Sequence, residues 1–300
     1  MNKRLKTFLK IIIIILLIVT GFTALRLVAG MLRSSTSDEN NVEDSYLGEN
    51  NVIGQNNPDE LLFLFAGVDS NGEKTGTRTD TLMLVLCNKA SKDIKIVSIP
   101  RDTRVYVNGN LDKINSAHSY GGMPLTLKTL REFMGIDLDY FLQVSFQGVV
   151  DGVDALGGIE IDVDQRVADA MNMKPGPHTF DGERALWYVR FRKGYGDADL
   201  GRIKTQQDFV VSFIKQALKP KNIFKLPKVY GAMSENMETN IPFSTLASFA
   251  WSFKNISDAD ISTYTIDGYP ETIEGVSYFI PDSQSVLDLR NSLLYNYLEE

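Results

Sequence analysis

Three largely apolar runs set the strand pattern of this chain: LLFLFAGV (Leu61–Val68), TLMLVLC (Thr81–Cys87) and IKIVSI (Ile94–Ile99). Each run has the length and composition of a buried strand. Only Asn88–Asp93 separates the second run from the third, and so short a turn joins antiparallel neighbours. Together with the helical patterns in the rest of the chain, these runs predict an α/β fold with a central mixed β-sheet flanked by helices.

Charged side chains stand where the three predicted strands end. Asp69 follows the first strand, Asp80 precedes the second and Arg101 follows the third. If the first strand also pairs antiparallel to the second, all three side chains emerge at one edge of the sheet. Two carboxylates and a substrate phosphate are typical Mg²⁺ ligands, although either aspartate alone is more simply explained as a loop cap. The sequence therefore predicts two carboxylates and an arginine in one crevice.

A basic cluster interrupts an otherwise acidic chain at Phe191–Gln207, FRKGYGDADLGRIKTQQ, with one arginine just before it. Its cations are Arg190, Arg192, Lys193, Arg202 and Lys204. Arginine forks match phosphate oxygens and keep their charge, and a cluster at a helix start suggests a phosphate or pyrophosphate site. A solvated charged loop is the alternative for this segment alone. Beside Arg78, Arg101 and the two aspartates, binding of a metal and a phosphate becomes the better interpretation.

The remaining elements follow from periodicity and capping residues. Asp112–Gly122 is polar and ends in a glycine pair, so we expect a loop that enters a helix. Arg202 and Gln206 are spaced i,i+4 and share one face of their predicted helix. The expected helical segments are Pro124–Met134, part of Leu142–Leu156, a helix from an Asp181 cap to Tyr188, Gly201–Leu218, and Ser283–Leu298 after an Asp282 cap; the further strands are Ile159–Val163, Ile261–Ile266 and Val276–Ile280.

Several function classes find no support in the residues. His118 and His178 are the only histidines, and neither forms a convincing catalytic triad or zinc arrangement. No GxxxxGK[ST] or GxGxxG is present, so a nucleotide-binding loop is not expected. Cys87 is the single cysteine, which excludes an intrachain disulfide, and its apolar context predicts a buried side chain.

The N-terminal region differs from the rest in charge. Residues 1–33 carry six bases and no acid, and subtracting those six charges from the chain's −7 leaves −13 for the remainder. So acidic a domain is a poor partner for nucleic acid.

This region also predicts the topology. Residues 1–10 are expected to be a cytoplasmic tail and residues 11–32, which begin IIIIILLIVT, a transmembrane anchor across the ~30 Å of a bilayer. A cleaved signal peptide is the alternative, but no clear small-x-small site follows the apolar core. Residues 33–57 have the polar composition of a linker, and residues 58–300 are predicted to form one extracellular domain behind the anchor.

Six stretches resemble the LytR-CpsA-Psr family in sequence and in order. They are FAGVDSNGEKTGTRTDTLMLV, VSIPRDTRV, DKINSAHSYGG, VDALGGIEIDV, FDGERALWYVRFRK and DADLGRIKTQQ, and SYFIPD near residue 280 is also similar. The resemblance implies a phosphotransferase that uses Mg²⁺, or Mn²⁺ in its place. Such an enzyme moves wall teichoic acid or capsular polysaccharide from an undecaprenyl-pyrophosphate carrier to N-acetylmuramic acid of peptidoglycan at the cell membrane of a Gram-positive cell.

The resemblance also assigns roles to single residues. Asp69 and Asp80 match the metal positions, and with Arg78 and Arg101 they are the expected catalytic residues. The pyrophosphate-binding positions are Arg78, Arg101, Lys113, Asn115, Arg190, Arg192, Arg202 and Gln206. One departure puts a phosphate contact in doubt, because many members read Arg-Gln-Gln where this chain reads Thr205-Gln206-Gln207.

Two other functions stay open from the sequence: an adaptor that binds lipid-linked glycans without chemistry, and a polyprenyl-pyrophosphate hydrolase. A transcriptional regulator fits badly, because a ten-residue tail cannot hold a DNA-binding domain. A prenyl chain would need an apolar trench, expected from strands 61–68 and 81–87 and segments 125–134 and 141–156. An ordinary core needs the same residues.

Overall fold

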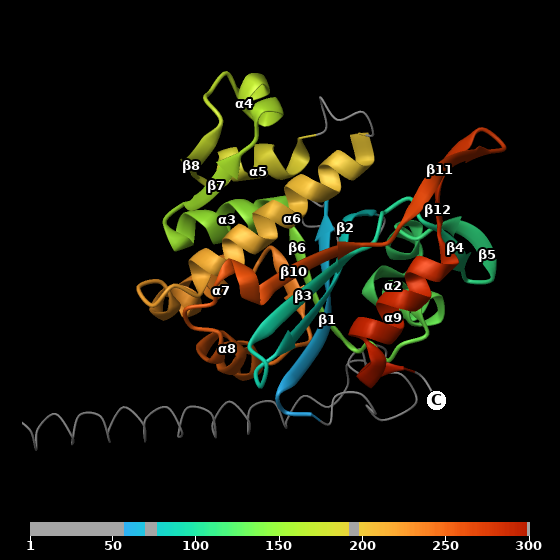
Figure 1. Ribbon diagram of the computed structural model, residues 1–300, viewed down its shortest axis with the longest axis horizontal. Helices are drawn as coiled ribbons and strands as arrows, with labels where there is room; N and C mark the ends of the chain where they lie inside the picture. The colour runs from blue at the N-terminus through green and yellow to red at the C-terminus, as the bar shows by residue number, and fades with distance from the viewer. Residues whose placement is uncertain (1–56, 70–76, 192–197, 299–300) are drawn as a thin grey trace, which may run out of the picture. The chain divides into compact units, whose positions relative to one another are not determined.

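The computed structural model describes residues 57–69, 77–191 and 198–298 (Figure 1). The predicted tail, the anchor and all of the linker except Asn57 lie outside the described residues, as do Arg192 and Lys193. Within the described ranges, no helix is both long and apolar enough to cross a bilayer. The topology predicted for the N-terminal residues therefore stays a prediction.

A six-stranded mixed sheet forms the centre of the described domain, with strand order β10-β3-β2-β1-β6-β9. Its members are β1 (Glu60–Val68), β2 (Thr79–Asn88), β3 (Asp93–Ser98), β6 (Tyr140–Ser145), β9 (Met237–Thr239) and β10 (Ile261–Thr265). β2 pairs antiparallel with both β1 and β3, which confirms the predicted arrangement of the first three strands. β1 runs parallel to β6, and β3 runs parallel to β10, so the sheet is mixed as predicted.

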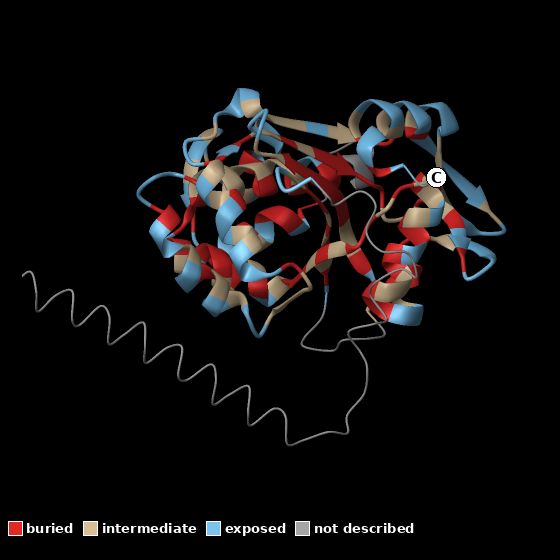
Figure 2. Cartoon of the chain, turned by 90° about the horizontal axis from the view of Figure 1, so that it is seen from below, coloured by how far each residue is buried: buried red, intermediate tan, exposed pale blue. Residues whose placement is uncertain are grey.

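Helices cover both faces of this sheet (Figure 1). One face is covered by α2 (Ser116–Met134) and α9 (Ser283–Leu293), and the other by α3 (Phe146–Leu156), α5 (Gly182–Arg190) and α6 (Ala198–Ala217). Side chains of β1 alternate between the two layers, with Leu62 and Leu64 in the first and Phe63 and Phe65 in the second. Figure 2 shows the resulting core, buried between helices whose outer faces are exposed.

Smaller elements surround the central sheet. Three two-stranded sheets are formed by β4 (Arg104–Val107) with β5 (Asn110–Lys113), β7 (Ile159–Val163) with β8 (Gly176–Phe180), and β11 (Gly268–Ile273) with β12 (Val276–Pro281). The short helices are α4 (Gln165–Met171), η2 (Ile223–Lys225), α7 (Leu226–Met233), α8 (Phe243–Ser252), η3 (Asp258–Asp260) and η4 (Tyr295–Tyr297).

Both predicted aspartate caps are confirmed. The Asp181 carboxylate accepts a hydrogen bond from the Arg184 N–H at 2.9 Å, at the start of α5. The Asp282 carboxylate accepts one from the Gln284 N–H at 3.0 Å, at the start of α9. Each satisfies a backbone donor that the first helical turn leaves without an intrahelical partner.

One segment prediction needs correction, and another, that part of Leu142–Leu156 is helical, is confirmed. Asp112–Gly122 is not a loop throughout, because α2 already begins at Ser116 and is broken internally at Gly121–Gly122, where Gly122 has a φ of 63°. The helical path resumes towards Pro124, whose missing N–H is tolerated in a first turn. Leu142–Leu156 combines the end of β6 with α3, which starts after a Ser145 cap. Because the whole segment is apolar, its sequence does not show where the strand period ends and the helical period begins.

Cys87 is buried at the end of β2, as predicted. Burial raises the pKa of its thiol to about 12, with a further contribution from the Asp93 carboxylate. The side chain therefore packs as a small hydrophobic group.

Candidate active site

A β-bulge places Asp80 at the predicted edge of the sheet. In the β1–β2 pair, Gly67 stands opposite Thr81 but Val68 stands opposite Thr79, so Asp80 is left without a partner. A bulge of this kind bends the strand and re-aims a side chain. Asp69 follows β1 directly, so the two carboxylates lie at the same edge, as the antiparallel pairing predicted.

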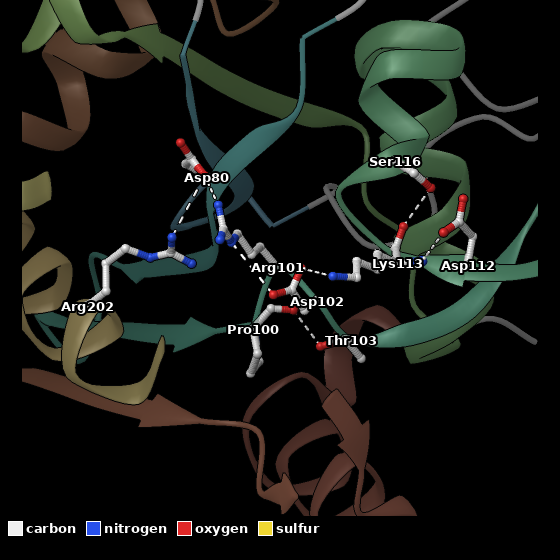
Figure 3. Close-up of polar contacts among 9 residues, drawn as sticks. All are labelled: Asp80, Pro100, Arg101, Asp102, Thr103, Asp112, Lys113, Ser116 and Arg202. Carbon is white, nitrogen blue, oxygen red and sulfur yellow. Dashed lines mark hydrogen bonds and ion pairs between the residues drawn. The ribbon is translucent and has the colours of Figure 1, made fainter. Parts of the chain in front are cut away.

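Two arginines converge on the Asp80 carboxylate (Figure 3). Arg101 Nη1, from the segment after β3, donates a hydrogen bond to Asp80 Oδ1. Arg202 Nη1, from α6, lies 3.9 Å from the same oxygen. The predicted meeting of Asp80 with Arg101 is therefore confirmed, and Arg202 of the basic cluster joins them.

Asp102 extends this network to Lys113 and was missed from the sequence. Its carboxylate lies 3.1 Å from Lys113 Nζ and 3.8 Å from Arg101 Nε (Figure 3). Arg101, Lys113 and Arg202 thus share the carboxylates of Asp80 and Asp102. These groups carry three positive and two negative charges, so this network favours an anion in a domain that is otherwise acidic.

Helix α6 holds Arg202 in a buried position. Arg202 is 2 % exposed and Gln206, one turn later, is 8 % exposed, so the shared face predicted for them is the buried one. Thr205 is the residue at which the chain departs from the family pattern. Its hydroxyl donates a hydrogen bond to the Arg202 carbonyl at 2.9 Å, and the side chain carries no charge. Lys204 is exposed and pairs with Asp208 at 2.9 Å, so it lies outside the buried face that carries Arg202 and Gln206.

Gln207 links this helix to the sheet through hydrogen bonds, and the sequence did not predict this role. Its side-chain amide donates to Ser98 Oγ at 2.8 Å, to the Tyr264 carbonyl at 3.0 Å and to Thr265 Oγ1 at 3.1 Å. These acceptors belong to β3 and β10. Gln207 therefore positions the N-terminal half of α6 against the strand that leads to Arg101.

Asn115 and His118 are buried beside the site. Asn115 is 3 % exposed, and its Oδ1 has no hydrogen-bond partner among the described residues. His118 Nδ1 donates to the Thr77 carbonyl at 2.7 Å, and Nε2 lies 2.8 Å from the Gln143 amide oxygen. Both ring nitrogens of His118 are thus occupied, which supports its structural role.

The other predicted site residues have no described contact with Asp80. Asp69, Arg78 and Arg190 are exposed, and in the described part of the chain neither arginine contacts Asp80. The Arg190 guanidinium instead lies 4.8 Å from the centre of the Phe146 ring. Arg192 falls outside the described residues, so its role stays a prediction.

The positive charge of Arg78 acts on the carboxylate of Asp112. Burial raises the pKa of the Asp112 carboxyl, but hydrogen bonds from the Tyr120 hydroxyl and the Lys113 N–H outweigh this effect, and the Arg78 charge adds to them. The net pKa of Asp112 is lowered, so Asp112 is a carboxylate that holds Tyr120 and attracts Arg78.

The carboxylates of Asp69 and Asp80 are suited to bind Mg²⁺ together with the oxygens of a substrate phosphate. No group of three or more His, Cys, Asp or Glu side chains in the described ranges could hold a metal unaided. Mg²⁺ is commonly bound through one or two carboxylates with substrate phosphate oxygens and waters. Asp69 and Asp80 at one edge supply such a donor set, and Arg101 neutralises Asp80 in the structure described here.

An apolar cavity of about 190 Å³ lies between the sheet and the helices of its second face. It is lined by Phe63, Phe65, Val85, Leu142, Val144, Gly148, Val149, Phe209, Val210, Phe213, Ile214 and Met233. Strands 61–68 and 81–87 and segment 141–156, which were expected to line an apolar trench, contribute to this lining. Segment 125–134 does not, because it belongs to α2 on the opposite face. Helix α6 takes its place.

The sequence model of the LytR_cpsA_psr family matches residues 28–294. The chain belongs to this family. The match spans the sheet, the arginine network and the apolar cavity, so the resemblance drawn from six short stretches is confirmed over almost the whole described domain.

Named relatives within the family are transferases and a regulator. The chain is 30 % identical over 263 residues to the polyisoprenyl-teichoic acid--peptidoglycan teichoic acid transferase TagU of Bacillus anthracis, covering 85 % of this chain and 83 % of that protein. It is also 30 % identical over 265 residues to Biofilm regulatory protein A of Streptococcus mutans, covering 81 % and 64 % respectively.

Solved family structures share the fold. The crystal structure of B. subtilis TagV superimposes with a TM-score of 0.69 at 31 % identity, covering 80 % of this chain and 98 % of that one. The structure of TagT bound to LI-WTA superimposes with a TM-score of 0.68 at 28 % identity, covering 84 % and 94 %. The α/β architecture is therefore that of the family.

Proposed function

We propose that this chain is a phosphotransferase that moves an anionic glycopolymer from an undecaprenyl-pyrophosphate carrier to N-acetylmuramic acid of peptidoglycan. The polymer is wall teichoic acid or capsular polysaccharide. One observation carries the proposal: Asp80 at the sheet edge meets Arg101 and Arg202, and the helix that holds Arg202 continues into the apolar cavity. The TagU name and the TagT complex with LI-WTA support the substrate class.

The arginine network binds the pyrophosphate. Arg101, Arg202 and Lys113 are held by carboxylates and by packing, so their charges are aligned before the substrate arrives. Such preorganised cations stabilise the charge that builds on the leaving oxygen without reorganisation cost. Arg78 and Arg190, together with Arg192, are proposed to complete the binding of the substrate phosphates.

The transfer itself is a displacement at phosphorus. A muramic acid hydroxyl attacks the phosphorus next to the polymer, a new O–P bond forms, and the bond to the lipid phosphate breaks. The lipid monophosphate departs with the bonding electron pair. The hydroxyl proton passes to a carboxylate, for which Asp69 is suited by its exposed position beside the site.

Asp69 and Asp80 would hold the metal ion together with the pyrophosphate oxygens. When bound there, Mg²⁺, or Mn²⁺ in its place, supplies positive charge to the leaving group. With a cation held there, Arg101 would be able to contact the phosphate instead of the Asp80 carboxylate. Two neighbouring carboxylates repel unless a cation lies between them, so the pair is suited to hold one.

The apolar cavity is proposed to hold part of the prenyl chain. On α6, Arg202 and Phe213 are eleven positions apart, or roughly 16 Å at the helical rise of 1.5 Å per residue. One rigid helix thus fixes the distance between the phosphate contacts and the apolar lining. A lipid-linked donor has the same two parts, a charged head and an apolar chain.

A transfer assay distinguishes this proposal from the adaptor and the hydrolase. The purified full-length chain is incubated with lipid-linked polymer, Mg²⁺ and peptidoglycan. We expect polymer bound covalently to the insoluble peptidoglycan and lipid monophosphate in solution. An adaptor would leave the donor intact, and a hydrolase would release the polymer equally well without peptidoglycan. Either of these results would contradict the proposal.

The cellular location is proposed from the sequence alone. Residues 1–10 are placed in the cytoplasm, residues 11–32 in the membrane, and the domain on the cell-wall side. Protease added to intact protoplasts should then digest the domain, while a cytoplasmic marker protein survives. Protection of the domain, with digestion only after lysis, would show that the topology is reversed.

A further inference from the structure

A basic and aromatic surface lies far along α6 from the arginine network, at the segment formed by η2, α7 and α8. Residues 209–234 contain five lysines and no acidic residue, in a chain whose net charge is −7. These lysines are Lys215, Lys219, Lys221, Lys225 and Lys228, and Lys254 follows α8. The proposed function uses none of them.

Large aromatic side chains are exposed among these lysines. Phe224 in η2 is 77 % exposed, the highest value among the large hydrophobic side chains that the structure describes, and Trp251 of α8 is 56 % exposed. Their ring centres are 6.2 Å apart, so the two rings form one exposed group. Tyr230 of α7 and Phe243 of α8 form a second pair at 4.8 Å. The first pair joins η2 to α8, and the second joins α7 to α8.

The charge of this surface is largely uncompensated. Lys215 pairs with Asp258, but in the described ranges none of the other five lysines forms an ion pair with a carboxylate. Lys225 Nζ donates to the Leu156 carbonyl at 2.7 Å, and Lys254 Nζ lies 4.8 Å from the Trp251 ring. Lys219, Lys221 and Lys228 are exposed. Glu235, also exposed, follows the end of α7 and is the nearest acid along the chain.

The chain enters the domain beside this surface. Lys89 Nζ donates to the Pro58 carbonyl at 3.1 Å and to Ser248 Oγ at 3.2 Å, so the first described residues are joined to α8. Ser248 and Trp251 are three positions apart and lie on neighbouring parts of one helical face. The predicted membrane anchor precedes Pro58, and the chain that follows it therefore reaches the domain at the end that carries the aromatic group.

We infer that the surface formed by Phe224, Trp251 and the lysines of residues 219–228 docks onto an anionic lipid bilayer. Tryptophan favours the interface between lipid headgroups and acyl chains, and phenylalanine inserts into it from amphipathic surfaces. Clustered lysines are attracted to anionic headgroups. A second copy of the domain would bring like charges together. The docked surface would hold the apolar cavity and the arginine network in a fixed orientation above the membrane. The inference rests on the proposed membrane attachment and not on the transfer chemistry.

Tryptophan quenching tests this docking directly, because the chain has two tryptophans. The Trp187→Phe variant of the full-length chain keeps Trp251, and the matched Trp251→Phe variant keeps Trp187, which lies on α5 against Phe191 at 5.1 Å. Both are reconstituted in vesicles of phosphatidylglycerol whose acyl chains are brominated near the headgroup. We expect strong quenching of Trp251 and little of Trp187. In phosphatidylcholine vesicles with the same bromination, the quenching of Trp251 should fall.

Charge variants give the second measurement. The double variant Lys221→Gln with Lys228→Gln should lower the ratio of docked to undocked domain roughly thirtyfold. Each lysine at an anionic surface contributes a factor of about five, and two lysines are removed. Lys204→Gln, an exposed lysine elsewhere on α6, should leave the quenching unchanged.

Three results would overturn the inference. They are equal quenching of both tryptophans, quenching that is independent of lipid charge, and a Trp251 signal that responds to soluble poly(glycerol phosphate) but not to brominated lipid. The last result would identify a polymer-binding surface. Because quenching requires no turnover, a chain that transfers polymer without docking would refute this inference alone.

Discussion

Replacing Asp80 with asparagine should reduce polymer transfer by roughly 10²- to 10³-fold or more, the range seen when one preorganised charge-stabilising group is lost. The substitution keeps the shape of the side chain and removes its charge. Asp80 is the carboxylate on which Arg101 and Arg202 converge, and it is a proposed metal ligand. The initial rate of transfer to peptidoglycan measures the effect, and circular dichroism and the melting temperature report whether the fold survives.

Asp208→Asn is the matched control, because Asp208 is a carboxylate on α6 that pairs with Lys204 and not with the site. It should transfer at the wild-type rate. EDTA should abolish transfer by the wild-type chain, and Mg²⁺ or Mn²⁺ should restore it. A folded Asp80→Asn variant with wild-type activity, or full transfer in EDTA, would leave the arginines as the only electrophilic groups and refute the metal proposal.

Replacing Arg202 with lysine should slow transfer by roughly 30- to 1000-fold, equivalent to ~2–4 kcal/mol of lost transition-state stabilisation. Lysine keeps the positive charge but loses the planar fork that can contact two phosphate oxygens. The exposed fraction of Arg202 is 2 %, so a lysine there cannot recover the contact by moving through solvent. The rate at saturating donor and the apparent donor affinity should be measured separately.

Lys204→Gln is the control for this variant, since Lys204 is two positions away and faces solvent. It should leave both kinetic values unchanged. If Arg202→Lys and Lys204→Gln are indistinguishable while both remain folded, Arg202 is a structural residue and the pyrophosphate is bound elsewhere.

The placement of Asp69, Asp80 and Arg101 at one edge of the sheet could be predicted because strand pairing determines where the strand ends lie. Asn88–Asp93 is too short for any connection except an antiparallel one, which sets the pairing of the second and third strands. The antiparallel pairing of the first strand with the second was assumed from the sequence, and the structure confirms it. The shared face of Arg202 and Gln206 follows from i,i+4 spacing, but the burial of that face is known only from the structure. These relations are local in the sequence.

Other parts of the site depend on contacts between distant segments. Asp102 meets Lys113 because the β4–β5 hairpin folds back, and Gln207 reaches β3 and β10 across more than fifty positions of sequence. No periodicity encodes such contacts. The replacement of α2 by α6 in the cavity lining has the same cause, because both helices carry apolar stripes and only the handedness of the connections decides which face each covers.

The position of the bond that breaks tests the proposed phosphotransfer most directly. The donor is prepared with ³²P only in the phosphate next to the polymer and is incubated with the full-length chain, Mg²⁺ and peptidoglycan. We predict that the label enters the peptidoglycan in equal amount with the polymer, as a phosphodiester, while the lipid monophosphate is unlabelled. Polymer attached to peptidoglycan without the label would instead show that the sugar–oxygen bond is cleaved, and would contradict displacement at phosphorus.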